Sequence, residues 1–538
     1  TTNSSATTPI WIDFADDSTT AGDLFVNNRS YNFSVITALN NNANAGFRIV
    51  AAFRPTTSTY VAATSTSSYA TTGTWRFDML TIQTAPANAT VSFVGTKTSV
   101  NETTSSVNII ANLQDAISTS SSVDIEILPI STATSGSDFI LPASLKFEWS
   151  PGQNLVNDTI TININNDIIS ENAEYFIVRF INPVNITLPS SSTNNYTVMI
   201  VDNDRVAPIA SQSITLNHIA SFSNGTSGTN SAEIVAHDPI SQRLFIANSI
   251  AGKIDIVNFK NPAAASLITS IPVTATYGNI NSIAVKNGIV AAAIENIIPE
   301  QPGKVVFFDT TGVFINQVNV GAMPDMITFT NDGTKVLTAN EGQPNAAYTV
   351  DPEGSISIIN ISGGIASLTQ TNVTTATFTS YNSQASSLKA SGIRIYGLNN
   401  ATVAQDMEPE YISFSADNNT AYVTCQENNA IAVVDIPTST ITALRPLGTK
   451  NHLLSNNSFD ISDVGTSIEM ANWPVKGLYM PDAIASYTAN GQLYYVTANE
   501  GDSREYTAYV EPARISSTTY ILDSLKFPYR DALKANLG

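Results

Sequence analysis

A strand–turn–strand unit that recurs along the second half of the sequence constrains the fold of this chain most. Its clearest copies are MPDMITFTNDGTKVLTANEG at 323–342, MEPEYISFSADNNTAYVTCQEN at 407–428 and MPDAIASYTANGQLYYVTANEG at 480–501. In each copy, two apolar runs of period two flank an Asn/Asp/Gly turn, and an acid or amide follows. This pattern predicts a β-hairpin that is used repeatedly.

Two earlier copies, at 232–252 and 281–296, extend the series. The starts at 232, 281 and 323 lie 49 and 42 residues apart, which is about the length of one four-stranded propeller blade. The later starts, at 407 and 480, leave room for long insertions. Because propellers usually close with four to eight blades and five copies are visible, we expect further blades beyond residue 538.

The rest of the chain also favours β structure, in several domains. Its 538 residues exceed one ordinary core, and only 13% are charged while 43% are hydrophobic. We therefore predict an all-β multidomain protein with three modules. These are a partial β-sandwich at 1–87, truncated at its N-terminus, an immunoglobulin-like sandwich at 88–204, and a β-propeller at 205–538 that is incomplete at its C-terminus.

The charge and cysteine content limit the partners and the compartment. A net charge of −20 opposes binding to nucleic acid or anionic lipid and suits divalent cations, although acidity also simply keeps a secreted protein soluble. The single cysteine, Cys425, excludes an internal disulfide, so we expect a bacterial exported protein and a buried thiol. No apolar run reaches the length of a membrane span, and we expect any export signal to lie outside these residues.

The second module carries a specific pattern. NNDIISENAEYFIVRFINP at 165–183 is followed by YTVMIVDND at 196–204, and GSDF at 136–139 comes before LKFEWSPGQ at 145–153. An acidic loop, a Glu-x-x-Glu before an aromatic strand and a terminal Asp-x-Asp resemble the Calx-β domain over the whole module. The resemblance implies a sandwich with a Ca²⁺ site at one tip.

Calcium prefers six to eight oxygen ligands, several of them carboxylates that converge from different loops. The candidate ligands, carried over from the motif, are Glu102, Asp138, Asp167, Glu171, Glu174, Asp202 and Asp204. Asn165, Asn166 and Asn203 stand where strong binders carry aspartates, and this substitution should weaken binding. The alternative is that the acids only cap turns.

In the third module, TANEGQPNAAYTVDPEGSISIINI at 338–361 and TANEGDSREYTAYVEPARI at 497–515 resemble the choice-of-anchor I family. This family is related to an animal mesenchyme-specific cell-surface glycoprotein. The resemblance implies secretion and attachment to a bacterial cell surface. The cell-envelope sorting machinery would read a C-terminal signal outside this chain. The first module is similar to segments of Bacteroidetes surface proteins.

The repeats also suggest a ligand site in the propeller channel. We expect Asp325, Glu408, Glu410 and Asp482 to ring one mouth, with Glu341, Glu427, Glu500 and Asp502 at the opposite strand ends. Clustered carboxylates repel one another unless a cation or proton relieves them, and Arg504 and Arg514 could clamp an anion. The alternative is that Gly342 and Gly501 only supply a positive φ, with Asn340 and Asn499 capping the turn.

The motifs of common enzymes are missing, among them His-Glu-x-x-His, Gly-x-Ser-x-Gly and the phosphate-binding loop. We therefore expect binding or adhesion to an unknown surface ligand, which is a glycan, a protein or a phosphate ester. Two alternatives stay open. One is a calcium-dependent phosphoesterase, a metal-dependent phosphoric ester hydrolase carried by the propeller. The other is a structural spacer.

Overall fold

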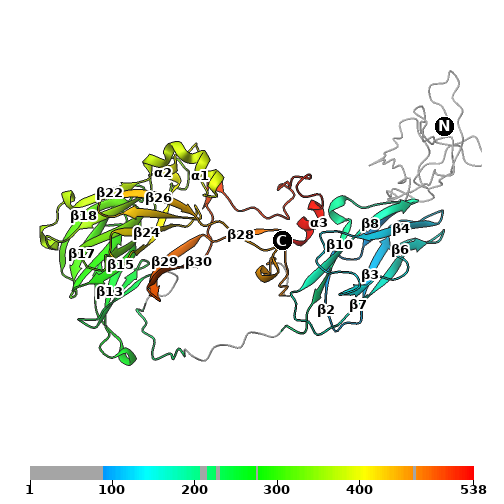
Figure 1. Cartoon of the computed structure of the whole chain (residues 1–538), viewed down its shortest axis with the longest axis horizontal. Helices are drawn as coiled ribbons and strands as arrows, with labels where there is room; N and C mark the ends of the chain where they lie inside the picture. The colour runs from blue at the N-terminus through cyan, green and yellow to red at the C-terminus, as the bar shows by residue number, and fades with distance from the viewer. Residues whose placement is uncertain (1–88, 206–214, 226–230, 274–276, 464–467, 538) are drawn as a thin grey trace, which may run out of the picture.

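The computed structural model describes residues 89–205, 215–225, 231–273, 277–463 and 468–537. The module predicted at 1–87 and its boundary lie outside these residues. The described chain is all-β and multidomain, which confirms the predicted fold class. In Figure 1 a sandwich in blue to cyan stands at one side and propeller blades in green to orange at the other, with the red C-terminal helix α3 beside the sandwich.

The sandwich consists of two five-stranded sheets. The first has the order β5-β7-β3-β1-β9, with bounds Phe139–Ile140, Asn157–Ile164, Ser106–Leu113, Ala89–Phe93 and Ile186–Thr187. The second has the order β2-β10-β8-β4-β6, with bounds Lys97–Asn101, Asn195–Val201, Glu174–Val184, Ser121–Ile127 and Lys146–Trp149.

Alternation along the strands builds the sandwich core. In β7, Ile160, Ile162 and Ile164 are buried while the residues between them face solvent. This is the period-two pattern of a strand with one buried face and one solvent-exposed face. The facing sheet contributes Phe180, which stacks on Phe93 across the core. The core fixes the two sheets and therefore the loops at their ends.

Within the described residues, four four-stranded antiparallel sheets follow, and we call them blades one to four. Blade one comprises β11 Val235–Asp238, β12 Arg243–Asn248, β13 Lys253–Asn258 and β14 Ser266–Pro272. Blade two comprises β15 Ile280–Lys286, β16 Ile289–Ile294, β17 Pro302–Asp309 and β18 Phe314–Ala322. Blade three comprises β19 Pro324–Phe329, β20 Lys335–Asn340, β21 Ser355–Asn360 and β22 Val373–Thr377. Blade four comprises β23 Pro409–Phe414, β24 Thr420–Cys425, β25 Ala430–Asp435 and β26 Thr440–Pro446.

The first strand of each blade lies beside the first strand of the next blade. β15 lies beside β19, β19 beside β23, and β23 beside β29 (Pro481–Ala489). β29 pairs with β30 (Gln492–Asn499), and this hairpin occupies the place of a fifth blade. We call the side of the blade series on which these first strands lie the channel, and each of the five sequence repeats forms one inner hairpin that contains a first strand. Cys425 is fully buried at the end of β24, as expected.

Short elements connect and cover the blades. They are α1 Ala385–Ser391, α2 Val403–Asp406, α3 Arg530–Asn536, β27 Thr449–Asn451, β28 Lys476–Leu478, β31 Glu505–Tyr506 and β32 Tyr509–Val510. The 3-10 helices span Ser191–Thr193, Pro262–Ala264, Ile365–Ser367, Gln370–Asn372, Thr379–Gln384 and Ser455–Asn457. No helix among the described residues is both long enough and apolar enough to cross a bilayer.

Part of the sequence assigned to the propeller packs on the sandwich instead. Trp473, from the insertion before β28, stacks on Tyr175 of β8 with 4.2 Å between ring centroids. Leu533 of α3 belongs to the same buried cluster. The repeat pattern could not predict this contact, because residues outside the repeat units make it.

Gly354 offers a test of how blades three and four meet. A Cβ at this position would lie 1.9 Å from the carbonyl oxygen of Met407, so the backbone itself would have to move. We expect Gly354→Ala to destabilise the propeller by at least about 2 kcal/mol, as overpacking of tight sites does. Gly363→Ala is the matched control, because the nearest atom to its new Cβ is Ser367 Oγ at 3.8 Å. Calorimetric unfolding of both variants checks this, and equal transitions would contradict the packing described.

Candidate functional site

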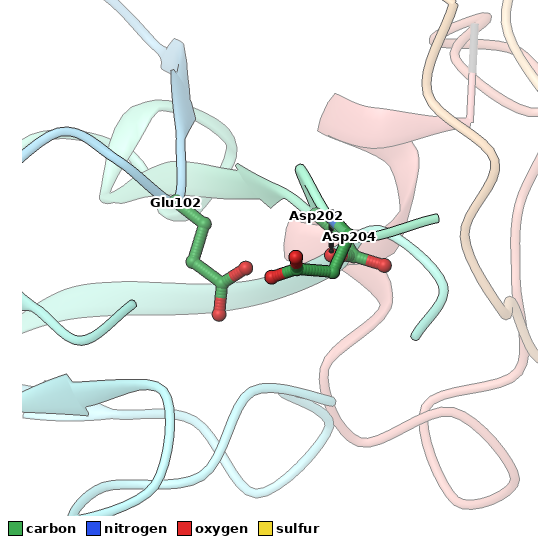
Figure 2. Close-up of side chains that lie close together, drawn as sticks. All are labelled: Glu102, Asp202 and Asp204. Carbon is green, nitrogen blue, oxygen red and sulfur yellow. Dashed lines mark hydrogen bonds between the residues drawn. The ribbon is translucent and has the colours of Figure 1, made fainter. Parts of the chain in front are cut away.

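Three acids meet at one tip of the sandwich because of how two strands pair. Glu102 directly follows β2, while Asp202 and Asp204 follow β10. These strands run parallel, with Asn101 opposite Val201, so both end at the same edge. Carboxylate oxygens of the three acids lie within 4.8 Å of one another. Figure 2 shows the three side chains turned toward a common space.

A second group of acids lies at the same tip. Asp138, at the start of β5, Glu171 in the loop before β8, and Glu174, the first residue of β8, also bring carboxylate oxygens within 4.8 Å. Asp202 Oδ2 accepts a hydrogen bond from the Glu171 N–H at 2.7 Å, which joins the two groups. Asp167 lies close enough to Glu102 and Glu171 for its charge to raise the pKa of both. The structure therefore gathers all seven acids chosen from the sequence.

Among the ion pairs of the described residues, none includes these acids, and all of them except the exposed Glu171 are partly or fully removed from water. Burial, followed by neighbouring negative charges, raises the pKa of Glu102 and Glu171. Burial raises the pKa of Glu174 to about 8, with further contributions from its hydrogen bond and charge interaction with Asp138. Glu102 is only 7% exposed, and within the residues that the structure describes neither its Oε2 nor Oδ2 of Asp204 has a hydrogen-bond partner.

The donor set fits a hard divalent cation such as Ca²⁺, which takes oxygen ligands in flexible geometry. Orphaned buried oxygens are the groups that a cation would satisfy. Asn165, which replaces an aspartate of strong binders, donates instead to the carbonyl oxygens of Gly136 and Ser137. It thereby ties down the loop that carries Asp138.

A second acidic region lies in the propeller, where an irregularity recurs in the inner hairpins. Strand pairing shifts register directly after Ile280, Pro324, Pro409 and Pro481. Such a shift places an extra residue in one strand and re-aims its side chain. The residues in these positions are Asn281, Asp325, Glu410 and Asp482.

The carboxylates after the second strands lie at the same end of each hairpin as these residues. Pro324 pairs with Asn340, so Asp325 and Glu341 are neighbours, and Glu410 joins them within 4.8 Å. The expectation that Glu341, Glu427, Glu500 and Asp502 occupy the opposite strand ends is therefore wrong. Antiparallel pairing brings the start of one strand to the end of the next.

The remaining acids lie around this group. Glu408 and Glu427 are buried beside it, whereas Glu500 and Asp502 are exposed. Asp482 is half-buried, and its charge adds to burial in raising the pKa of Asp325 to about 7. In blade three, Glu341 directly follows the second strand. In blade four, Gln426 takes this position and Glu427 comes one residue later.

The two candidate arginines are engaged by carboxylates. Arg504 is buried and forms ion pairs with Asp406 and with Glu408, the latter at 2.6 Å. Arg514 pairs with Asp463 at the surface. Neither guanidinium is free to hold an anion bidentately in this arrangement, which corrects the expected clamp. Arg504 instead lies over the ring of Tyr396, 4.5 Å from its centroid.

At the turn after the second strand, the glycines have the predicted backbone conformation, whereas Asn340 does not make the predicted cap. Gly342 and Gly501 have φ of 67° and 81°, which confirms the predicted positive φ. Asn340 does not cap the turn, because its buried side chain donates to Ser355 and Ser357 of β21. The glycine thus serves the turn, while Glu341 remains available to the channel.

The sequence reasoning missed several polar residues at the channel. Glu295 follows the second strand of blade two, in the position of Glu341, and accepts a hydrogen bond from Asn281 at 3.0 Å. Aligning the repeats could have found both. Asp406 belongs to α2, an insertion outside the repeat, so no sequence signal marked it.

Family models agree with this architecture. A choice-of-anchor I domain model matches residues 233–537, more than half of the chain. The chain belongs to the choice-of-anchor I family. A Calx-β domain model matches residues 86–204 of the same choice-of-anchor I chain, so both resemblances stated from the sequence are confirmed.

Some solved structures resemble parts of this choice-of-anchor I chain. The apo form of a Calx CBD1 domain is 26% identical, with 22% of this chain and 99% of that one covered and a TM-score of 0.19. Kuenenia stuttgartiensis hydrazine synthase is 15% identical over 42% and 52% of the chains, with a TM-score of 0.28. The β-propeller domain of Myceliophteria thermophila Cps50 (Swd1) is 10% identical over 39% and 58%, with a TM-score of 0.26. No curated protein matches the chain.

The pKa of Glu174 predicts how pH affects the calcium-free sandwich. The folded state holds a proton on Glu174 up to about pH 8, whereas the ordinary value is 4.5. Its stabilising contribution is therefore complete below about pH 4.5 and is lost as the pH rises through about 8. In calcium-free buffer, the unfolding temperature of the sandwich should fall from pH 5 to pH 8, and Glu174→Gln should flatten this dependence. A rise over that range in the wild type would contradict the environment described for Glu174.

Proposed function

We propose that this chain is a cell-surface protein that binds an external ligand through its propeller and uses Ca²⁺ to stiffen its Calx-β module. The observation that carries the calcium part is the buried carboxylate of Glu102, whose Oε2 has no partner within the acidic tip. The combination of a Calx-β domain with a choice-of-anchor I domain supports location at the surface.

The tip can coordinate calcium through two adjoining groups of acids. Glu102, Asp202 and Asp204 form one, and Asp138, Glu171 and Glu174 the other. Cations between them would offset the mutual repulsion that otherwise keeps some of these carboxyls protonated. Binding would also fix four chain segments that are separate in the sequence, at Glu102, Asp138, 171–174 and 202–204.

The acidic tip is connected to the junction with the propeller module. Asn172, next to Glu171, donates to the carbonyl oxygen of Ser455 at 2.6 Å. The Ala173 N–H donates to the carbonyl oxygen of Met470 at 3.1 Å. Calcium that orders the loop at 171–174 would therefore also order its contact with the insertion at 451–475. In a protein that presents a propeller outside the cell, this coupling would make the junction stiffer when calcium is plentiful.

Calcium removal and ligand substitution test the first part. At a free calcium concentration 100 times Kd, binding should stabilise the sandwich by about 2.7 kcal/mol. We expect the double variant Glu102→Gln, Asp202→Asn to lose the calcium-dependent rise in the unfolding temperature of the sandwich. Asp115→Asn is the matched control, an exposed acid of the same module outside both groups. A double variant that responds to calcium like the wild type would refute the assignment.

The phosphoesterase alternative has less support than binding, because Arg504 and Arg514 are both held by carboxylates. Incubation of the full chain with p-nitrophenyl phosphate, with calcium and then with a chelator, separates the two. We expect no turnover in either condition. Chelator-sensitive hydrolysis would overturn binding as the sole function.

Ligand binding itself is tested with the full chain on arrays of glycans and extracellular proteins, each with calcium and with chelator. Retention on a defined subset is expected. Its complete absence would favour the spacer alternative. Antibody labelling of intact cells that express the chain tests surface exposure in the same experiment.

A further inference from the structure

The acidic group in the propeller channel is built by two blades. Asp325 lies in the irregular start of β19 and Glu341 directly follows β20, so both belong to blade three. Glu410, on β23, comes from blade four. Carboxylate oxygens of all three lie within 4.8 Å of one another, and Glu341 and Glu410 are 8% and 5% exposed. Three carboxyl groups are thus held together, two of them buried and Asp325 partly buried.

Two further carboxylates lie beside this group with unused oxygens. Glu427 and Glu408 are 3% and 1% exposed, and the Oε2 atom of each has no hydrogen-bond partner among the described residues. Their charges add to burial in raising the pKa of Glu341 and Glu410, so both carboxylates lie within electrostatic range of the group. A buried polar oxygen without a partner is costly unless something outside the chain satisfies it.

No ion pair within the part of the chain that the structure describes balances the group. Arg504 is bound to Asp406 and Glu408. Arg394 is paired with Glu511. Among the ion pairs of the described residues, none includes Asp325, Glu341 or Glu410.

The backbone close to these acids contains strained residues. Met323, two residues before Asp325, has φ of 47°, and Met480 before Asp482 has φ of 39°. Residues other than glycine seldom adopt this region, and such strain persists only where the surrounding structure enforces it. The strand pairing is also irregular directly after Pro324 and Pro409, where Asp325 and Glu410 lie.

We propose that the propeller binds a hard divalent cation, Ca²⁺ by preference, through Asp325, Glu341 and Glu410, with Glu427 as an adjoining carboxylate. The site goes beyond the proposed function, because it lies in the propeller and is separate from the acidic tip of the sandwich. Calcium suits it because the donors are carboxylate oxygens in a number that its flexible coordination accepts. The cation would link blades three and four at the channel.

The test uses the full chain carrying Glu102→Gln, Asp202→Asn, Glu171→Gln and Glu174→Gln, which alter both acid groups of the sandwich tip, so that calcium at the tip does not contribute. In this background we expect calcium to raise the unfolding temperature of the propeller. Adding Glu341→Gln and Glu410→Gln should weaken calcium binding, measured by calorimetric titration, at least about tenfold, since even outer partners of metal ligands matter that much. Glu300→Gln is the matched control, a glutamate of blade two outside the group.

Two results would overturn the proposal. One is a propeller transition that calcium does not move in the background variant, with no calcium found by elemental analysis after gel filtration. The other is an equal calcium response with and without Glu341→Gln and Glu410→Gln. If this pair of substitutions prevents folding, Glu410→Gln alone and the calcium content of the background variant decide the question. Because ligands of both acid groups at the sandwich tip are already substituted, failure here is distinguishable from failure of the calcium assignment at the tip.

Discussion

Carboxylates held out of water without counter-charges are the constraint on which this account depends. Burial disfavours the charged form, and neighbouring negative charges add to this, so each group must take up protons or a cation. Glu102 at the sandwich tip and Glu341 in the channel both meet these conditions, and their pKa values are raised for the same reason. Buried oxygens without partners beside each of them favour the cation.

Both acidic groups follow from how strands pair rather than from neighbours in the sequence. Parallel β2 and β10 end at one edge and bring Glu102 to Asp202. Antiparallel β19 and β20 bring the start of one strand to the end of the next, and so Asp325 to Glu341. A shift in pairing after Pro324, Pro409 and Pro481 then turns the acid that follows each of these prolines. The same fold thus serves as scaffold and as the source of the proposed ligands.

The sequence predicted those parts of the molecule that repeat or follow a motif. The Calx-β pattern pointed to the six acids that form the two groups at the tip, and the repeat predicted the inner hairpins and the positive φ of Gly342. It could not predict the partners of Arg504, because Asp406 comes from an insertion without periodicity. The stacking of Trp473 on Tyr175 could not be predicted from the sequence either, because it joins residues about 300 positions apart by tertiary contact alone.

The most direct measurement is a crystal structure of the full chain grown with calcium, with an anomalous difference map recorded at long wavelength. The account predicts peaks at the sandwich tip beside Glu102 and in the channel between Asp325, Glu341 and Glu410, each within about 2.3–2.6 Å of several carboxylate oxygens. A map without peaks at either place, with paired carboxyls close enough to share protons, would contradict it.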